Sequence, residues 1–420
     1  MREMKDSGIE WVGQIPKGWE LRRAKTLFMQ RNSKGNEIEV LLSPTQKYGV
    51  VPQSQLEGVV QVKEDTDLQA FKTVHKGDFV ISLRSFQGGF EYSLYEGVCS
   101  PAYQVFYPTS PICDTYYRYL FKSQSFISKM NNLTVGIREG KNIQYVDFAN
   151  SQIPVPPLAE QERIAAFLDA ECAEIDTVLE KTRASIEEYK KLKQAVITQA
   201  VTKGIRGDRP MKDSGIEWIG DIPAEWGVVP HKRIMHKVKE ICEQYNGEDI
   251  ISLTVNGVVK RDLTAGGKMP TSFDGYQYVE PNDLLLCLFD IDVTPRCVGV
   301  VRDYGVTSPA YSRFVMHDGY YNAYYDYLLR MIDDNKVFVH LSKNLRSSLT
   351  ESDFGAIKAC APPLAEQKCI AAFLDARCDE IDALIAKKQQ YLIEIENYKK
   401  SLIYEYVTGK KEVKTSVLAD

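Results

Sequence analysis

The octapeptide MKDSGIEW at residues 4–11 occurs again, unchanged, at residues 211–218. The match continues beyond the octapeptide, because Pro16 and Trp19 reappear as Pro223 and Trp226. The period of about 207 residues is far longer than the roughly 20–50 residues of solenoid repeats. The sequence therefore predicts two copies of one large unit, related by a pseudo-two-fold axis.

A second pair of matching blocks closes each copy. PPLAEQ at residues 156–161 returns at 362–367, and IAAFLDA at 164–170 returns at 370–376. Between the opening and closing blocks the two copies differ greatly, and only short fragments align. A preserved frame around diverged contents indicates two modules of one architecture with two different targets. Gene duplication followed by drift is the simpler alternative, but drift should erode the frame as well.

Residues 158–202 and 364–408 are each predicted to form one long helix. Two prolines precede each helix, and Gly204 and Gly409 follow the helix ends. The apolar positions of the first helix are Leu168, Ile175, Val178, Leu179, Ile186, Leu192 and Val196, with Thr182 and Tyr189 in the same heptad series. Those of the second are Phe373, Leu374, Ile381, Leu384, Ile385, Leu392, Ile395 and Leu402. Because neither helix can bury a narrow stripe alone, an antiparallel coiled coil is favoured over packing of each helix on its own domain.

The remaining segments are predicted to mix strands and helices, which makes the fold class α+β. Strands are expected at residues 37–42, 78–83, 98–107, 249–254, 283–288, 298–302 and 312–316, and helices at 114–132 and 322–335. The predicted organisation is a first domain (1–155), a long helix (156–205), a second domain (206–361), a second long helix (362–408) and a flexible tail (409–420).

Composition narrows the class of protein. The chain has 52 basic and 57 acidic residues, so its net charge of −5 argues weakly against a nucleic-acid binder unless partners help. No apolar run approaches the roughly 20 residues that a membrane span needs. Nine cysteines without a C-x-x-C pair are typical of reduced thiols, which predicts a cytoplasmic location.

Motifs of common enzyme classes are missing from the sequence. It contains no P-loop, no G-x-G-x-x-G, no H-E-x-x-H and no G-x-S-x-G. Glu139-Gly140-Lys141 has the E-x-K spacing of some nuclease sites, but such triplets arise often by chance and the second copy lacks it. The chain is therefore predicted to recognise a target and not to catalyse a reaction.

Three loops in each copy have side chains suited to reading DNA. Arginine binds guanine, asparagine and glutamine bind adenine, and glycines allow close approach. In the first copy the loops are residues 45–49, 84–89 and 136–142, and the candidates are Lys47, Tyr48, Arg84, Ser85, Gln87, Arg138, Lys141 and Asn142. In the second copy the loops are residues 256–261, 290–296 and 343–347, and the candidates are Asn256, Lys260, Arg261, Arg296, Lys343, Asn344 and Arg346. Any single member could equally be an ordinary solvated charge, so the three aligned loops per copy are stronger evidence than any one residue.

The two repeated blocks resemble the DNA-specificity subunit of type I restriction-modification systems. The resemblance rests on the opening block (M-K-D-S-G-I-E-W-[VI]-G-x-I-P-x-x-W) and on the closing block around PPLAEQ, and it covers the whole chain. The second copy departs from the pattern where Ala359-Cys360 replaces Ile153-Pro154. The start of the helix is intact there, so the departure leaves the resemblance in place.

The resemblance implies a non-catalytic subunit with two target-recognition domains. Each domain would read one half of a split, asymmetric site in double-stranded DNA, and the paired helices would fix the gap. Two modification subunits would methylate adenine N6, and two restriction subunits would translocate and cleave DNA. S-adenosylmethionine, ATP and Mg²⁺ are accordingly expected on the partner subunits and none of them in this chain.

Two other classes of protein stay open from the sequence. The first is a non-catalytic scaffold whose two divergent domains bind other proteins. The second is a stand-alone nuclease or methyltransferase, which the missing cofactor motifs disfavour. Steep salt dependence of binding would favour DNA recognition over a mostly apolar protein interface.

Overall fold

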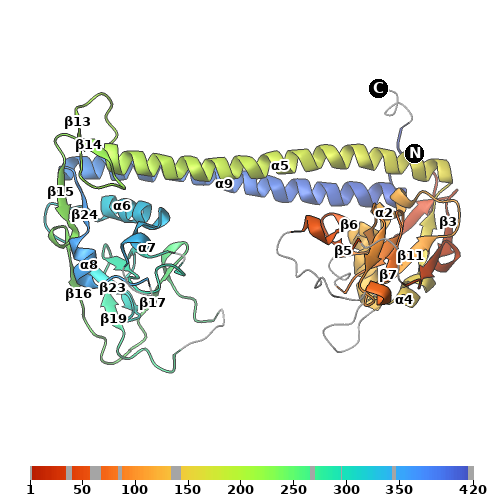
Figure 1. The fold of residues 1–420 in the computed structure, drawn as a ribbon, viewed down its shortest axis with the longest axis horizontal. Helices are drawn as coiled ribbons and strands as arrows, with labels where there is room; N and C mark the ends of the chain where they lie inside the picture. Colours follow the sequence, from red (N-terminus) through yellow and green to blue (C-terminus); the bar gives the residue numbers. More distant parts are fainter. Residues whose placement is uncertain are drawn as a thin grey trace. The chain divides into compact units, whose positions relative to one another are not determined.

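The structure is a computed structural model that describes residues 2–34, 40–56, 68–83, 88–133, 143–264, 270–294, 296–342 and 347–414. The chain divides into two compact units (Figure 1). Unit 1 contains Met1–Arg183 and Gln390–Asp420, and unit 2 contains Ala184–Gln389. Each unit therefore combines one globular domain with the beginning of its own long helix and the end of the other copy's helix.

Unit 1 is built around an antiparallel sheet in the order β4-β11-β8-β9. Its strands are β4 (Phe28–Arg31), β11 (Gln104–Pro108), β8 (Phe79–Ile81) and β9 (Glu91–Tyr92). Four further pairs or hairpin strands are β1 (Met4–Asp6) with β2 (Gln14–Pro16), β3 (Glu20–Arg23) with β12 (Gln152–Val155), β5 (Leu42–Thr45) with β6 (Gly49–Pro52), and β7 (Lys72–Val74) with β10 (Gly97–Cys99). The helices of the domain are α2 (Asp114–Lys122), α3 (Gln124–Leu133) and α4 (Tyr145–Asn150).

Unit 2 has a central sheet of the same order, β16-β23-β20-β21. Its strands are β16 (Met235–Val238), β23 (Ser312–Met316), β20 (Leu284–Leu286) and β21 (Val298–Val300). A second sheet contains β18 (Gly257–Lys260), β17 (Ile250–Thr254), β22 (Gly305–Thr307) and β19 (Gln277–Val279). The two-stranded pairs are β13 (Met211–Asp213) with β14 (Asp221–Pro223) and β15 (Gly227–Pro230) with β24 (Lys358–Ala361), and the helices are α6 (Asn322–Asp334), α7 (Val337–Leu341) and α8 (Glu351–Ala356).

The two predicted long helices are confirmed to within one residue, as α5 (Leu158–Lys203) and α9 (Leu364–Val407). In unit 1, Phe167 packs on Tyr406 with ring centroids 4.5 Å apart, and Lys399 forms an ion pair with Asp176. In unit 2, Lys193 of α5 lies 2.6 Å from Asp382 of α9. Residue numbers rise along one helix as they fall along the other, so the antiparallel pairing and the α+β class are confirmed.

The predicted seam of the coiled coil needs a correction. Val178, Leu192, Phe373 and Leu384 are 37–47% exposed, although the heptad pattern placed them in the seam. Buried positions of α5 include Leu168, Cys172, Leu179, Thr182, Ile186 and Ile197, and those of α9 include Ile370, Leu374, Cys378, Ile381, Ile385 and Leu402. A coiled-coil seam buries about two residues in every two helical turns, so apolar residues beside the seam stay exposed to solvent.

The repeated tryptophans attach each domain to the start of its own helix. The Trp19 indole donates a hydrogen bond of 2.9 Å to Glu160 in the first turn of α5. Trp226 donates to Glu366 of α9 over the same distance. All four residues belong to the repeated blocks, which explains why these blocks return together in both copies.

The repeated tyrosines hold the end of the other copy's helix. The Tyr116 hydroxyl donates to the carbonyl of Val407, the last residue of α9, at 2.7 Å. Tyr324 donates to the carbonyl of Val201, in the last turn of α5, at 2.8 Å. The last four carbonyls of a helix lack partners within the helix, so each buried tyrosine satisfies one of them. Each domain thus binds the helix that its own copy does not supply.

Several predicted elements differ from the structure. Residues 98–107 form two strands, β10 and β11, because a turn at Ser100 separates them. Residues 114–132 form α2 and α3, because Ser123 is extended (ψ 138°) and ends the first helix. The predicted strand at 37–42 lies partly outside the described residues, and β5 begins only at Leu42.

The tail also begins later than the predicted boundary at residue 409. Lys410 donates a hydrogen bond to the carbonyl of Val12, and Val413 is buried in the core of unit 1. The chain therefore stays on the domain through Val413. Residues 415–420 lie outside the described residues, so the flexible tail stays a prediction there.

Candidate nucleic-acid interface

The first predicted loop of unit 1 is the turn of the β5–β6 hairpin. The Thr45 hydroxyl donates to the Gly49 carbonyl at 2.9 Å and accepts from the Tyr48 amide at 3.0 Å. Gly49 has a φ of +72°, and a Cβ there would lie 2.6 Å from a backbone carbonyl of β9. We call these contacts between Thr45 and Gly49 the threonine–glycine clamp. The clamp requires these two residue types, and it leaves the three residues between them free to vary.

Lys47 and Tyr48 lie exposed at the tip of this hairpin. Tyr48 is 59% exposed, and the Lys47 ammonium lies 4.8 Å above its ring. The hydrogen bond with Tyr48 raises the pKa of Lys47, so the lysine is charged at neutral pH. An exposed cation beside an exposed aromatic ring can contact a phosphate and stack on a base.

The second predicted loop of unit 1 ends against the first. A Cβ at Gly88 would lie 2.7 Å from the Gln46 side chain. The Lys122 ammonium donates to the Gln46 carbonyl at 3.2 Å and to the buried Glu91 carboxylate at 2.6 Å. Burial raises the pKa of Glu91 to about 7, and Lys122 opposes that rise. One lysine therefore links the first hairpin to β9, which follows the second loop.

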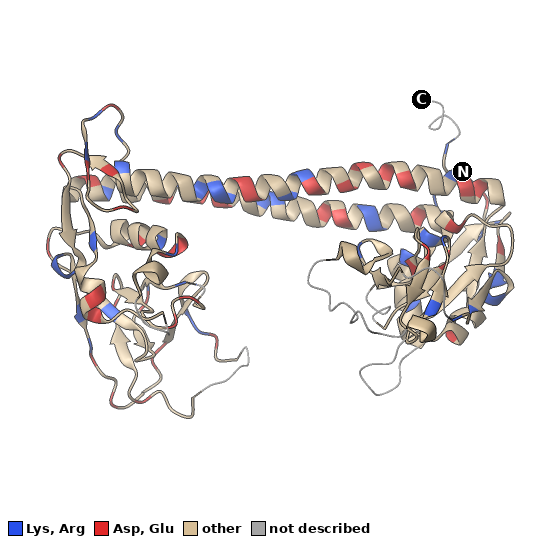
Figure 2. Ribbon diagram, in the orientation of Figure 1, with Lys and Arg blue, Asp and Glu red and all other residues tan. Residues whose placement is uncertain are grey.

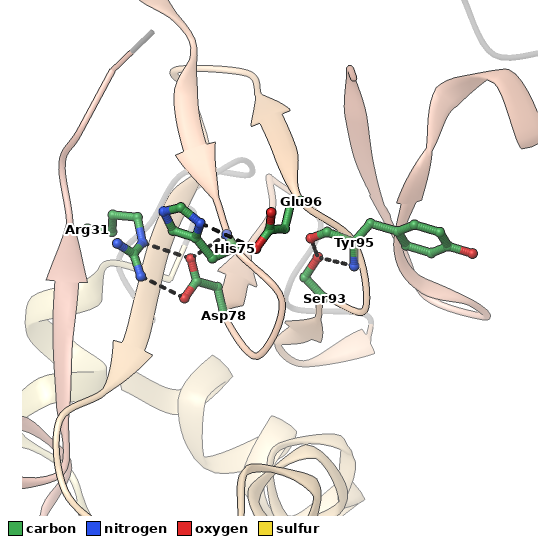
Figure 3. A network of polar contacts seen from close by, with 6 residues as sticks. All are labelled: Arg31, His75, Asp78, Ser93, Tyr95 and Glu96. Atoms are coloured by element: carbon green, nitrogen blue, oxygen red, sulfur yellow. Dashed lines mark hydrogen bonds and ion pairs between the residues drawn. The ribbon is translucent and has the colours of Figure 1, made fainter. Parts of the chain in front are cut away.

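An ion pair holds the turn before β8 in unit 1 (Figure 3). Arg31 binds Asp78 through two hydrogen bonds of 2.8 and 3.0 Å, and Asp78 also accepts from the backbone amide of His75. In the same view the Ser93 hydroxyl donates to the carbonyl of Tyr95. The network fixes the entry to β8, the strand that leads into the second predicted loop.

Unit 2 contains an equivalent arginine–aspartate ion pair. Its arginine comes from the strand next to the one that supplies Arg31 in unit 1. Arg313 of β23 lies 2.6 Å from Asp283, which accepts from the Glu280 amide as Asp78 does from His75. In unit 1, Arg31 of β4 lies opposite Val105 of β11. In unit 2, the corresponding pair is Val238 of β16 opposite Arg313 of β23, so the arginine and the valine have exchanged strands. Burial raises the pKa of Asp283 even though Arg313 opposes the rise. The sequence reasoning missed this pair, and only the shared aspartate directly before each strand could have indicated it.

The first predicted loop of unit 2 is a hairpin with the same clamp. The Thr254 hydroxyl donates to the Gly257 carbonyl at 3.0 Å and accepts from the Asn256 amide at 3.2 Å. Gly257 has a φ of +95°. The prediction of a loop over residues 256–261 is wrong for Gly257–Lys260, which form β18 because they pair with β17. Asn256 is exposed in the turn, where its amide can reach a base edge.

The basic candidates of unit 2 differ in how strongly acidic groups neutralise them. Lys260 forms ion pairs with Asp249 at 2.7 Å and Asp303 at 3.6 Å, and the hydrogen bond with Asp249 raises its pKa. Arg261 follows β18 and is exposed. The two neighbouring carboxylates make Lys260 a weak candidate for a phosphate contact.

Arg296 lies half-buried in a cleft of about 880 Å³ inside unit 2. The cleft is lined by α5 and α9 residues such as Lys193 and Asp382, and by Arg330 and Asp334 from the domain. Burial raises the pKa of Asp334, and the charge of Arg296 opposes that rise. Arg296 thus compensates acidic groups beside the helix pair, and its guanidinium also reaches the Asn256 turn, because a Cβ at Gly257 would lie 3.8 Å from it.

The other nine predicted residues lie outside the described residues. They are Arg84, Ser85, Gln87, Arg138, Lys141, Asn142, Lys343, Asn344 and Arg346, and the E-x-K triplet 139–141 lies outside as well. These assignments stay predictions. Among the residues that are described, no group of three metal-ligating side chains occurs, and no helix is long and apolar enough to cross a membrane.

Lys and Arg residues are interspersed with Asp and Glu residues along both long helices and over both domains (Figure 2). Sequence-independent affinity for DNA grows with the number of phosphate contacts, and the net charge of −5 does not favour many of them. The hairpin tips are better suited to base contacts than to general phosphate binding.

Comparison with known proteins identifies the class of protein that this fold defines. A family model described as a type I restriction modification DNA specificity domain matches residues 16–188. A putative type I restriction enzyme MjaX specificity subunit of Methanocaldococcus jannaschii is 25% identical over 96% of both chains. The type I restriction enzyme MjaVIII specificity subunit of the same organism is 27% identical over 66% of both chains.

Solved structures agree on the fold. One chain, from a study titled as the structural basis of complex assembly and conformational transition of the type I R-M system, matches with a TM-score of 0.69 at 16% identity. That match covers 94% of this chain and 99% of the other. The HsdS subunit from Thermoanaerobacter tengcongensis matches with a TM-score of 0.53 at 15% identity, over 97% and 100% of the two chains. The chain is thus similar over 96% of its length to a type I restriction enzyme specificity subunit, and its residues 16–188 match the DNA specificity domain of that family.

Proposed function

We propose that each unit reads one half of a split, asymmetric site in double-stranded DNA. The observation that carries this proposal is the pair of hairpins in units 1 and 2. Both use the same threonine–glycine clamp, at Thr45 and Gly49 and at Thr254 and Gly257, yet they present Gln46-Lys47-Tyr48 in one unit and Val255-Asn256 in the other. A constant support with variable tips is what two readers with different targets require.

We further propose that α5 and α9 fix the gap between the two half-sites. Both helices are continuous through the boundary between the units, and ion pairs join them in each unit. A helix resists shortening, because removing residues rotates its ends by about 100° per residue and breaks the packing at Trp19 or Tyr324. The gap length would then change only by insertions or deletions that keep the same faces of the helices against the domains.

In this proposal the chain recognises DNA and catalyses nothing itself. Two modification subunits would supply adenine-N6 methylation with S-adenosylmethionine, and restriction subunits would supply ATP- and Mg²⁺-dependent translocation and cleavage. Partners would also supply further phosphate contacts, because this chain has a net charge of −5. A cytoplasmic location, where such partners and DNA are found, stays part of the prediction.

The experiment that tests the proposal is adenine-methylation sequencing in cells that carry the modification subunit, with and without this chain. A split motif should appear only with the chain. Lys47→Ala combined with Tyr48→Ala should relax one half of the motif, and Asn256→Ala should relax only the other. Removing one side chain that bonds to a base edge should weaken binding by about 1–3 kcal/mol. An equal effect on both halves in either variant would contradict modular reading.

The alternative is a scaffold that binds proteins through its two divergent domains. The exposed apolar residues of the long helices, such as Leu192 and Leu384, favour it as a second candidate. Binding of the purified assembly to DNA at rising salt separates the two functions. DNA recognition should weaken steeply with salt, and an apolar protein interface should not.

A further inference from the structure

A cavity of about 560 Å³ lies in unit 2 between α8, the edge strand β16 and the short 3-10 helix η4 (His231–Arg233). Its apolar lining comes from Met235 of β16, Phe314 of β23 and Phe354 of α8. The candidate nucleic-acid interface uses none of these residues. The cavity therefore needs an explanation of its own, and the two related units supply a comparison.

Unit 1 fills the equivalent space with a tyrosine ring. α4 corresponds to α8, since each helix ends two residues before the strand, β12 or β24, that leads into a long helix. The first residue of α4 is Tyr145, and the first residue of α8 is Glu351. The centroid of the Tyr145 ring lies 5.9 Å from that of Phe106 and 6.1 Å from that of Phe148. The Tyr145 hydroxyl donates to the Phe28 carbonyl at 2.9 Å.

The residues around Tyr145 are the counterparts of the residues that line the cavity. By sheet register, by place in the helix and by place in the edge strand, the pairs are Phe106 with Phe314, Phe148 with Phe354, and Phe28 with Met235. Unit 2 has Glu351 in place of the tyrosine, and its carboxylate lies 3.4 Å from the Lys237 ammonium, with both side chains partly exposed. The cavity is therefore the space that an aromatic ring occupies in unit 1.

The backbone at the cavity keeps the acceptor that the tyrosine uses in unit 1. The His317 amide donates to the Ile234 carbonyl, so the alternation of an antiparallel pair turns the Met235 carbonyl away from β23. The Phe28 carbonyl, which accepts from Tyr145 in unit 1, has the same position in its strand. An aromatic ring in the cavity thus meets a carbonyl if it carries a donor.

A second acceptor is His231, a fully buried residue of the cavity lining. Its Nδ1 lies 2.8 Å from the Ile357 carbonyl and therefore carries the proton. Burial lowers the pKa of His231 to about 4, although the Ile357 carbonyl opposes the shift, so the ring is neutral and Nε2 has a free lone pair. Among the described residues, no donor reaches this buried atom. A buried acceptor without a partner is costly, so the site is suited to a ligand that supplies a donor.

We propose that this cavity binds a small aromatic molecule that carries a hydroxyl or amino donor. Its ring would lie against Phe314 and Phe354, as Tyr145 lies against their counterparts, and its donor would meet the Met235 carbonyl. A second donor on the ring would meet Nε2 of His231. The volume of about 560 Å³ is within the range of roughly 300–1,000 Å³ that is usual for small-molecule sites.

The test measures the binding of p-cresol, which is the tyrosine side chain without its backbone, to the full chain. p-Xylene is the matched control compound, because a methyl group replaces the hydroxyl at nearly the same size. Ligand-observed NMR and thermal unfolding follow both compounds. We expect p-cresol to bind with a Kd about tenfold lower than that of p-xylene, since only p-cresol can donate to a buried acceptor. p-Cresol should also raise the unfolding temperature of unit 2.

Two substitutions at one position locate the binding. Glu351→Tyr returns the residue that unit 1 has at this place, so it should abolish p-cresol binding without lowering the unfolding temperature of the free chain. Glu351→Gln removes the ion pair with Lys237 but adds no ring, and its affinity should stay within about twofold, because exposed ion pairs contribute little. Circular dichroism checks that both variants fold.

Three results would overturn the proposal: equal affinity for the two compounds, binding of neither, or unchanged binding of p-cresol by Glu351→Tyr. Loss of p-cresol binding in both variants would make the ion pair responsible instead of the space, and would overturn the proposal as well.

Discussion

Units 1 and 2 fill corresponding positions of their hydrophobic cores with different side chains. The core of unit 1 contains Phe28, Phe79 and Phe121, where unit 2 has Met235, Leu284 and Leu329. The contacts of the repeated blocks, in contrast, agree atom for atom, because both indole–carboxylate bonds measure 2.9 Å. A core tolerates exchanges that keep its total volume, whereas a hydrogen bond to a helix end requires a particular atom at a particular place. The comparison explains how such a chain can change its target and keep its architecture.

The buried ion pair lies between these extremes. Both units keep the aspartate in the turn, but the arginine comes from β4 in unit 1 and from β23 in unit 2. In unit 1, β4 is the neighbour of β11, and in unit 2, β23 occupies the place of β11, so a guanidinium on either of two adjacent strands can reach the same carboxylate. A cation beside the buried aspartate is therefore kept in both units, but the strand that supplies it differs.

The largest expected effect comes from moving this arginine. Arg313→Val leaves Asp283 buried without its cation and should cost about 3–5 kcal/mol of unfolding free energy in unit 2. Adding Val238→Arg places the guanidinium on the strand used by Arg31 and should restore most of that stability. Hydrogen exchange of the β20 and β23 amides, read against denaturant, measures both variants locally.

The same pair of substitutions contains its own control. Val238→Arg alone adds a second cation beside an intact pair and should not stabilise unit 2. If the double variant is no more stable than Arg313→Val, then the two strands are not interchangeable as the source of the arginine.

The sequence predicted the parts of the fold that repeat or that extend over many residues. The long helices were predicted to within a residue because prolines, glycines and a long apolar stripe mark their limits. Heptad spacing alone placed Val178 and Leu384 wrongly in the seam, since adjacent positions of a stripe look alike in sequence. The basic composition of residues 257–260 predicts a loop, but pairing with β17 makes them a strand, and local composition does not record that pairing.

The candidate site was less predictable than the fold. The hairpin tips at Lys47 and Asn256 follow from turn chemistry, but their common clamp requires knowing which threonine meets which glycine. Partners such as Arg31 and Asp78 are far apart in the chain and meet only through the strand order. No local sequence pattern indicates an interaction of that kind. Local sequence also does not show that a lysine is neutralised by an aspartate, as Lys260 is by Asp249.

A smaller effect is expected from Glu91, a buried carboxylate of unit 1 whose counterpart in unit 2 is Gly299. Its pKa rises from 4.5 to about 7 on folding, so the folded state keeps the proton longer than the unfolded chain does. The contribution of this group to stability is fully present below pH 4.5 and is lost as pH rises through about 7, with a slope of at most about 1.4 kcal/mol per pH unit.

Glu91→Gln keeps the shape of the side chain and cannot ionise. The stability of the unchanged chain minus that of the variant, from thermal unfolding of unit 1 at several pH values, should fall between pH 4.5 and 7. Lys122→Met should steepen the dependence at its upper end, because the cation that lowers the pKa of Glu91 is gone. A flat difference across this range would mean that the carboxylate is solvated in the folded state.

The smallest effect concerns the tyrosines that hold the helix ends, and it tests most directly whether the two units are equivalent. Tyr116→Phe and Tyr324→Phe each remove one hydroxyl and leave the carbonyl of Val407 or Val201 buried without its donor. Each should cost about 1 kcal/mol, since the ring still fills its space. Because the two bonds have nearly the same length and burial, the two effects should agree closely and should add in the double variant. A markedly larger destabilisation for Tyr116 would show that the end of α9, which continues into a buried Val413, is held more tightly than the end of α5.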